Sequence, residues 1–431
     1  MAVQAVVLAM THAVICTLTG LFVAAQAVAP QAVAPTVARL VRQLDATEKA
    51  RREDAERQLL ELGPAALPHL PAPDAGSAEV RLRVARIRTQ LETRQGEEQV
   101  QASQVTISGK ELSLADVLSG IEKQTTNKLV DFRNEFGQQA GAKSLNLDLE
   151  RTPFWPAVDQ ILDQAGMTIY SYAGVPGLSL VNRAGDELPR YKRGVYAGAF
   201  RIEATDITAR RDLRDPNGHT LKLAVQVAWE PRLAPIAITQ AAANVTGVGD
   251  NGETLAAGSA GEFEATVNPG DSSADMPLTF ALPSRDMKKI ARLKGSFGVM
   301  MPGQVEAFRF DKLGEDTPRE QRRGAVKVVL DQVRRNNDVW EVRTRIVFDT
   351  PGRALESHRT WVLHNEAVLE TPDKKTIDFA GLETTRQTES EVGVSYLFDV
   401  PDIAGCTFVY TTPTVLLNAS VPYELHDIPL P

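Results

Sequence analysis

The sequence predicts an α+β multidomain protein with an N-terminal helical pair, a small β-α-β-β-α-β-β domain and a mostly antiparallel β-sandwich C-terminal half. Three observations predict it: apolar residues recur at helical spacing up to residue 94, the period switches repeatedly between residues 102 and 183, and alternating runs separated by turns follow from residue 195. A chain of 431 residues is also too long for one ordinary core. The predicted segments are a signal peptide or anchor (1–27), a linker (28–35), a helical segment (36–94), a small domain (102–183) and two β-sandwich units (195–311 and 312–431).

The composition is that of a soluble globular protein, with 43% hydrophobic and 24% charged residues. The net charge of −8 argues against electrostatic capture of nucleic acid or of anionic membranes. The Arg-rich stretch RLRVARIRTQLETR (81–94) does not change this, because residues 36–98 hold 11 basic and 11 acidic side chains. This stretch is best explained as a solvated helix face.

The N-terminus predicts export to the periplasm or cell envelope. Residues 5–29 form an apolar run without charge, and Ala25-Gln26-Ala27 fits the small-x-small pattern of signal-peptide cleavage, which makes Val28 the first mature residue. A signal peptide normally begins with Lys or Arg, whereas the first charged residue here is Arg39. An uncleaved anchor is therefore the alternative, and it would be the only contact with a membrane.

Residues 36–94 read as helices. TVARLVRQLD begins one helix, KARREDAERQLLELG gives a second that stops at Gly63, and Ser77 caps a third. In the third helix, one face carries Val80, Val84, Ile87 and Leu91. LLELGPAALPHL followed by AEVRLRVARIRTQL resembles one HEAT-type repeat, and a single repeat has no neighbour to stack on. We therefore expect it to pack on itself or on the next domain.

Residues 102–183 alternate between strands and helices. VTISG, KLVDF, LNLDL, MTIYSY and LSLVN are predicted strands. Ser113 caps the first helix, and Thr152 caps the second with Pro153 at its first position. Gly166 ends the second helix, after which MTIYSY and LSLVN pair across a loop.

Two stretches of this domain, ISGKELSLADVLSGIEKQT and LNLDLERTPFWPAVDQILDQAGMTIY, resemble the short N-terminal domain shared by secretins and TonB-dependent receptors. The resemblance implies a periplasmic, non-catalytic module that docks onto partners or neighbouring copies. No secretin channel domain and no series of barrel strands follow, so only the fold is carried over. Phe154 and Trp155 are expected to pack between helix and sheet, and an edge strand such as KLVDF or LSLVN could accept a partner strand.

From Val195 onward the pattern is of strands. The clearest are AFRIEATDI, LKLAVQVAWE, EFEATV, PLTFAL, AVKVVLDQV, VWEVRTRIVF, HRTWVLH and GVSYLFDV, separated by turn signals such as DPNG and DNGE. The charged stretch 311–324 is the expected boundary between two sandwiches.

Motifs that suggest chemistry have ordinary structural explanations. Gly247-Val-Gly249-Asp-Asn-Gly252 matches a dinucleotide fingerprint but precedes no helix, so it predicts a hairpin. DLRDPNGHT (212–220) lacks calcium ligands at its ends and predicts a turn. His358 and His364 would stand roughly 20 Å apart on one strand, too far to share a metal ion.

Cysteine and carboxylate chemistry leave few candidates. Of the two cysteines, Cys16 lies in the N-terminal apolar run and follows Ile15, which excludes a lipoprotein site, and Cys406 in GCTFVY is expected to be a small core residue. Glu230, after Trp229, is the carboxylate to inspect first for glycosidase chemistry.

The sequence therefore predicts no catalytic, metal or cofactor-binding residues, and a non-enzymatic envelope protein that binds or scaffolds partners, either an envelope protein or a glycan. Two alternatives stay open: a carboxylate-dependent hydrolase of envelope glycans or peptides, and an accessory subunit of a secretin or TonB-type assembly.

Overall fold

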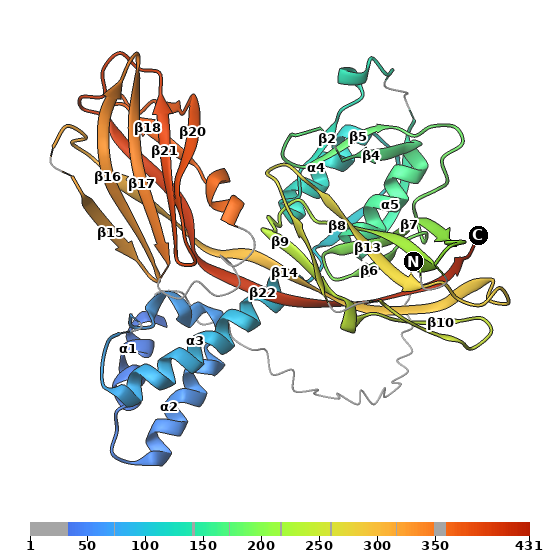
Figure 1. The fold of residues 1–431 in the computed structure, drawn as a ribbon, viewed down its shortest axis with the longest axis horizontal. Helices are drawn as coiled ribbons and strands as arrows, with labels where there is room; N and C mark the ends of the chain where they lie inside the picture. Colours follow the sequence, from blue (N-terminus) through green and yellow to red (C-terminus); the bar gives the residue numbers. More distant parts are fainter. Residues whose placement is uncertain are drawn as a thin grey trace, which may run out of the picture.

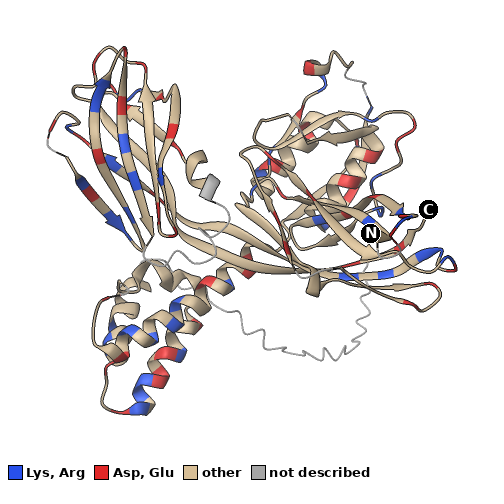
Figure 2. Cartoon of the chain, viewed as in Figure 1, with Lys and Arg blue, Asp and Glu red and all other residues tan. Residues whose placement is uncertain are grey.

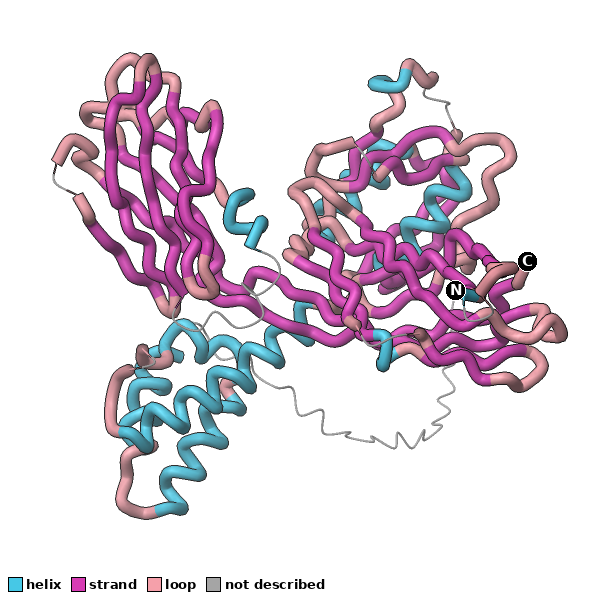
Figure 3. Tube along the Cα trace, in the orientation of Figure 1, coloured by secondary structure: helices cyan, strands magenta, loops and turns pink. Residues whose placement is uncertain are grey.

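The computed structural model describes residues 33–431 except 73, 140–142, 172, 216–217, 259–260, 316 and 349–358. Helices and several antiparallel sheets are both present, and strands dominate the C-terminal half, so the predicted α+β class is confirmed at this level (Figure 3). The predicted signal peptide lies outside the described residues.

The helical segment has its own apolar core. It consists of α1 (Val33–Gln43), α2 (Lys49–Glu61), the 3₁₀ helix η2 (Gly63–His69) and α3 (Ala78–Gln99). The predicted Ser77 cap is confirmed, since its Oγ accepts from the Val80 N–H at 3.3 Å, and the predicted stripe of α3 is buried. The linker predicted for 28–35 is wrong at its end, because α1 begins at Val33. Pro35 is tolerated in the first turn, where its missing N–H has no intrahelical partner to lose.

The small domain has the predicted order of elements. These are β1 (Gln104–Leu112), α4 (Leu114–Thr125), β2 (Leu129–Asp131), η3 (Asn134–Phe136), β3 (Leu145–Pro153), α5 (Phe154–Ala165), β4 (Met167–Tyr170) and β5 (Leu178–Asn182). β1 and β3 form one antiparallel pair, and β2-β5-β4 form a second sheet. Both sheets share a core with the two helices, in which Phe154 and Trp155 are buried as predicted. The caps at Ser113 and Gly166 are confirmed.

Two predictions for the small domain are wrong. Thr152 does not cap α5, because it pairs with Val105 in the β1–β3 ladder, and the strand continues to Pro153. The Phe154 N–H instead donates to the Ser103 carbonyl at 2.9 Å. LSLVN is not an edge strand, since β5 pairs with β2 on one side and β4 on the other.

The C-terminal half contains three sheets. Its strands are β6 (Val195–Ala197), β7 (Phe200–Arg210), β8 (Thr220–Trp229), β9 (Ala237–Ala241), β10 (Thr246–Gly249), β11 (Thr254–Ala256), β12 (Glu262–Thr266), β13 (Ser273–Ala281), β14 (Lys289–Phe310), β15 (Arg319–Arg323), β16 (Val326–Asn336), β17 (Val339–Phe348), β18 (Ala367–Glu370), β19 (Thr376–Asp378), β20 (Gly381–Gln387), β21 (Glu391–Phe398) and β22 (Thr407–Pro429). Their orders are β13-β8-β7-β6, β15-β16-β17-β21-β20 and β11-β10-β14-β22-β18-β19, with β9 beside β14 and β12 beside β9.

A long antiparallel ribbon of β14 and β22 joins the two β regions (Figure 1). Each strand extends roughly 75 Å at about 3.3 Å per residue. One half of the ribbon shares a core with β7, β8 and β13, which we call the first β region. The other half shares a core with β16, β17 and β21, the second β region. The end of β22, residues 419–428, thus packs in the first core although the sequence assigned 312–431 to the second unit. The single strand β22 therefore contributes to both of the β units that the sequence pattern predicted as separate.

The strand predicted for HRTWVLH is wrong. Arg359–His364 form the 3₁₀ helix η6, in which adjacent Trp361 and Val362 are both buried. The Trp361 ring packs on Phe348, with ring centroids 5.8 Å apart. His358 lies outside the described residues.

Candidate binding cleft

The motifs singled out from the sequence lie in structural positions. Gly247 and Gly249 are in β10, which pairs with β11 in the predicted hairpin. The segment 212–220 connects β7 to β8, where the Asp212 carboxylate accepts from the Arg214 N–H at 2.9 Å. Cys406 is buried in the second β core as expected, and burial raises the pKa of its thiol.

Glu230 is fully buried and all its oxygen atoms have hydrogen-bond donors. Oε1 accepts from the Ser103 N–H at 2.8 Å, and Oε2 accepts from Ser103 Oγ at 2.5 Å, Asn127 Nδ2 at 2.9 Å and Arg232 Nε at 2.7 Å. The Arg232 guanidinium also donates to the carbonyl of Gln99, the last residue of α3, at 3.1 Å. Glu230 therefore ties α3, the small domain and the first β region together, and its role in this arrangement is structural.

A second buried cluster surrounds Asp159 of α5. Its carboxylate accepts from Arg190 Nε at 2.9 Å, Arg201 Nε at 2.7 Å and the Tyr196 hydroxyl at 2.8 Å. Arg201 also donates to Glu203 at 2.5 Å. Burial raises the pKa of Glu203, but the neighbouring guanidinium charges outweigh burial, so its pKa lies below the ordinary value.

We call the Glu230 and Asp159 clusters together the closed junction. Trp155 adds to it, since its Nε1–H donates to the Ala199 carbonyl at 3.0 Å. Each carboxylate in the closed junction is surrounded by donors, which is the condition for burying charge at acceptable cost. The small domain is thereby fixed on the first β region.

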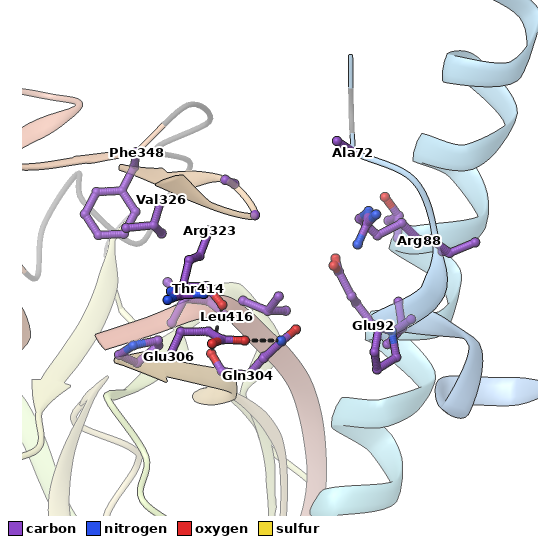
Figure 4. Close-up of a pocket in the computed structure, with 18 of the residues that line it drawn as sticks. Ala72, Arg88, Glu92, Gln304, Glu306, Arg323, Val326, Phe348, Thr414 and Leu416 are labelled. Atoms are coloured by element: carbon purple, nitrogen blue, oxygen red, sulfur yellow. Dashed lines mark hydrogen bonds between the residues drawn. The ribbon is translucent and has the colours of Figure 1, made fainter. Parts of the chain in front are cut away.

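The helical segment and the ribbon do not pack against each other along their whole length. Here lies a cleft of about 740 Å³, which we call the open cleft (Figure 4). It joins a second hollow of about 280 Å³, with which it shares residues of η2, α3 and both ribbon strands. One wall comes from η2 and α3, and the other from β14, β22 and the turn between β15 and β16. Its lining includes Leu67, Leu70, Val84, Ala85, Met300, Ala325, Val326, Phe348, Pro413, Val415 and Leu416.

The open cleft exists because α3 meets the ribbon at only one end. At Gly96, a Cβ atom would lie 2.8 Å from the Asn418 carbonyl oxygen, so any side chain there would push the helix away. Toward its N-terminus, α3 leaves the ribbon, and its residues Val84, Ala85, Arg88, Thr89 and Glu92 line the cleft. The volume lies within the roughly 300–1,000 Å³ typical of ligand sites.

Four charged side chains line the open cleft. Arg88 Nη2 donates to the Pro71 carbonyl at 2.9 Å, and the Arg323 guanidinium lies 5.7 Å from the Phe308 ring centroid. On the ribbon, Glu306 accepts from Gln304 Nε2 at 2.6 Å. Glu92 makes no hydrogen bond or ion pair within the described parts of the chain, and burial raises its pKa, although the charge of Arg88 opposes this effect.

The sequence did not single out any residue of the open cleft as a binding residue. Arg88 and Glu92 have the i, i+4 spacing of a common helix pair and belong to the stretch interpreted as a solvated face. One signal was present: Gly96 lies inside a helix, where glycine costs about 1 kcal/mol relative to alanine. Such a glycine indicates close packing of the backbone against a neighbour.

Comparisons with protein-family models, curated proteins and solved structures find no match. Within the described residues, no helix is both long and apolar enough to cross a membrane. The same residues contain no group of three or more side chains placed to hold a metal ion.

Proposed function

We propose that the protein is a non-enzymatic binding or scaffolding protein of the cell envelope and that a partner occupies the open cleft. The observation that carries the proposal is the cleft itself, a largely apolar space of about 740 Å³ between the helical segment and the ribbon. At the closed junction, hydrogen-bond donors surround the buried carboxylates, as a permanent contact between parts of the chain requires. Among the described residues, the Glu92 carboxylate of the open cleft has no such donors, which is consistent with a surface that another molecule covers.

Location in the envelope rests on the N-terminal sequence and on the small domain. The observed β-α-β-β-α-β-β order supports the resemblance to the secretin and TonB-receptor domain, a docking module, and the accessory-subunit alternative follows from it. Sequencing the N-terminus of the mature protein tests export. Processing predicts Val28 as the first residue, whereas an intact N-terminus in the soluble fraction would contradict it.

Strand addition to the small domain is a second route to partner binding. β2 pairs with β5 alone in the described residues, so its other side is an edge. In this parallel pair the Lys128 carbonyl accepts from Leu178 and the Phe132 N–H donates to Leu180, so the Asp131 N–H faces the free side. Asp131→Pro would remove this backbone donor, with Asp131→Ala as the control for the lost carboxylate. Partner capture that is unchanged in Asp131→Pro would assign docking elsewhere.

The hydrolase alternative has one place in the described structure, because Glu92 and Glu306 line opposite walls of the open cleft. It predicts that the purified protein cleaves peptidoglycan fragments and that Glu92→Gln and Glu306→Gln each abolish cleavage. Binding of the fragments without cleavage would favour the scaffold.

Cross-linked pull-down from isolated envelopes tests the main proposal. Ala85→Trp places a large side chain in the open cleft at an exposed position of α3, and Ala50→Trp on α2 is the matched control. We expect a defined partner to be lost with Ala85→Trp only. Equal capture by both variants would contradict the proposal. Deleting residues 102–183 is a poorer test, because it removes Ser103 and Asn127 and leaves Glu230 buried without them.

A further inference from the structure

We propose that the occupant of the open cleft is an extended polypeptide segment whose apolar side chains fill the cleft and whose Lys or Arg side chain pairs with Glu92. The inference rests on the proposed function and names the chemistry of the partner. Three features of the cleft support it: its apolar walls, the unpaired carboxylate of Glu92 and the free side of β14.

The walls favour apolar side chains. Leucine, valine, proline and alanine side chains from the helical segment face methionine, phenylalanine and further aliphatic side chains from the ribbon and from sheet β15–β20. Contact between apolar surfaces contributes about 25 cal/mol per Å² removed from water. A segment with several apolar side chains would therefore gain affinity along the length of the cleft.

The charges favour a cation. Both arginines of the cleft already interact with protein groups, Arg88 with the Pro71 carbonyl and Arg323 with the Phe308 ring. The carboxylates come from opposite walls, Glu92 from α3 and Glu306 from β14 (Figure 4). Within the described residues, the Glu92 carboxylate has no hydrogen bond or ion pair, and Arg88 acts on it only through its charge, so a Lys or Arg side chain would supply a bonded partner. The lining holds two carboxylates and two guanidinium groups, so the preference for a cation comes from the unpaired Glu92 and not from net charge.

The free side of β14 favours an extended backbone over a small amine. β9 and β10 pair with β14 only up to Met300, and from Gln304 to Phe308 its strand partner in the described chain is β22 alone. Gln304 and Glu306 from this one-sided stretch line the cleft. A strand side without a ladder partner next to an apolar cleft is suited to bind an extended segment, with backbone bonds for affinity and side-chain pockets for specificity.

Selection from a library of short random peptides tests the inference with the full chain as bait and Ala85→Trp as the counter-selection. A selected peptide is then synthesised and its Kd measured by fluorescence anisotropy. We expect enriched sequences with apolar residues around one Lys or Arg. Glu92→Gln should weaken binding by at least about tenfold, the size expected for a hydrogen bond to a charged group. Glu97→Gln, an exposed position of the same helix, should leave Kd unchanged.

The outcomes separate the inference from the function on which it rests. Peptides that bind wild type but not Ala85→Trp, without a basic residue and without sensitivity to Glu92→Gln, would overturn the cationic assignment and keep the cleft as a binding site. Selected peptides enriched in Asp or Glu would also overturn the cationic assignment and keep the cleft as a binding site. Failure to select any peptide that distinguishes wild type from Ala85→Trp would overturn the polypeptide inference, and loss of the envelope partner in the pull-down would then show whether a different ligand class uses the cleft.

Discussion

The closed junction and the open cleft differ in the hydrogen bonds that their carboxylates accept. At the closed junction, Glu230 and Asp159 are fully buried and accept hydrogen bonds from several donors each. At the open cleft, Glu92 is partly buried, lines a cavity and has no bonded donor in the described residues. Figure 2 shows that basic and acidic residues are spread over the helical segment and both β regions, so the presence of charge alone does not distinguish the two sites. A buried carboxylate surrounded by hydrogen-bond donors indicates a structural role. A carboxylate that lines a cavity without such donors indicates a binding site.

The largest expected effect is at Asp159. Asp159→Ala leaves two buried guanidinium groups, of Arg190 and Arg201, without their shared carboxylate. Removing one partner of a buried ion pair costs about 3–5 kcal/mol. Urea denaturation should show a loss of this size in the free energy of unfolding, and a loss below about 1 kcal/mol would contradict the structural role of this cluster.

Glu230→Gln should have the next largest effect. Glutamine keeps the shape but loses the charge that Arg232 and three further donors stabilise, so we expect about 2–3 kcal/mol of destabilisation. Denaturation of this variant measures the effect. If Glu230→Gln is neutral for stability yet abolishes an activity, the residue is catalytic and the comparison fails.

Glu341 tests whether donors around a buried carboxylate also stabilise the fold at a position outside the closed junction. This buried carboxylate of β17 accepts from Arg334 at 2.6 Å, Arg343 at 2.5 Å and Ser395 at 2.8 Å. Burial opposes ionisation, but these bonds lower the pKa from 4.5 to about 2. The stabilisation is therefore present above pH 4.5 and disappears as the pH falls toward 2.

Glu341→Gln should consequently cost about 1–2 kcal/mol at pH 7 and progressively less in acid. Denaturation at several pH values between 7 and 3 measures the trend. A cost that stays constant across this range would mean that the charge of Glu341 does not supply the stabilisation.

The smallest effect, and one of opposite sign, is expected at Glu92. Because burial raises its pKa, ionisation destabilises the folded state, and this penalty is complete above the raised pKa and absent below the ordinary value of 4.5. Glu92→Gln should therefore slightly raise Tm at pH 7 and leave Tm unchanged in acid. A lower Tm at pH 7 would reveal a stabilising partner for Glu92.

The sequence predicted local features better than long-range ones. The caps at Ser77 and Ser113 and the buried stripe of α3 depend on residues a few positions apart, and all are present. Thr152 failed as a cap because the β1–β3 ladder, formed with residues more than forty positions away, extends through it. Propensity is a weak prior when such pairing competes with it.

The candidate site could not be predicted from neighbouring residues, because it also depends on long-range pairing. Lys289 pairs with Pro429 and Phe310 with Phe408, so the ribbon joins segments separated by about a hundred residues or more. The cleft then needs a third segment, α3, to stand against that ribbon. Arg88 and Glu92 have the spacing of an ordinary solvated pair, and only their position opposite the ribbon makes them candidates for binding.

Site-specific photo-cross-linking compares the two regions most directly. A benzoylphenylalanine residue replaces Ala85 in the open cleft or Tyr191, a partly exposed residue beside the closed junction. After irradiation of isolated envelopes, the account predicts that position 85 cross-links to one defined polypeptide, identified by mass spectrometry, and that position 191 does not. Cross-links from position 191 alone, or equally from both positions, would contradict the claim that the open cleft is the binding site.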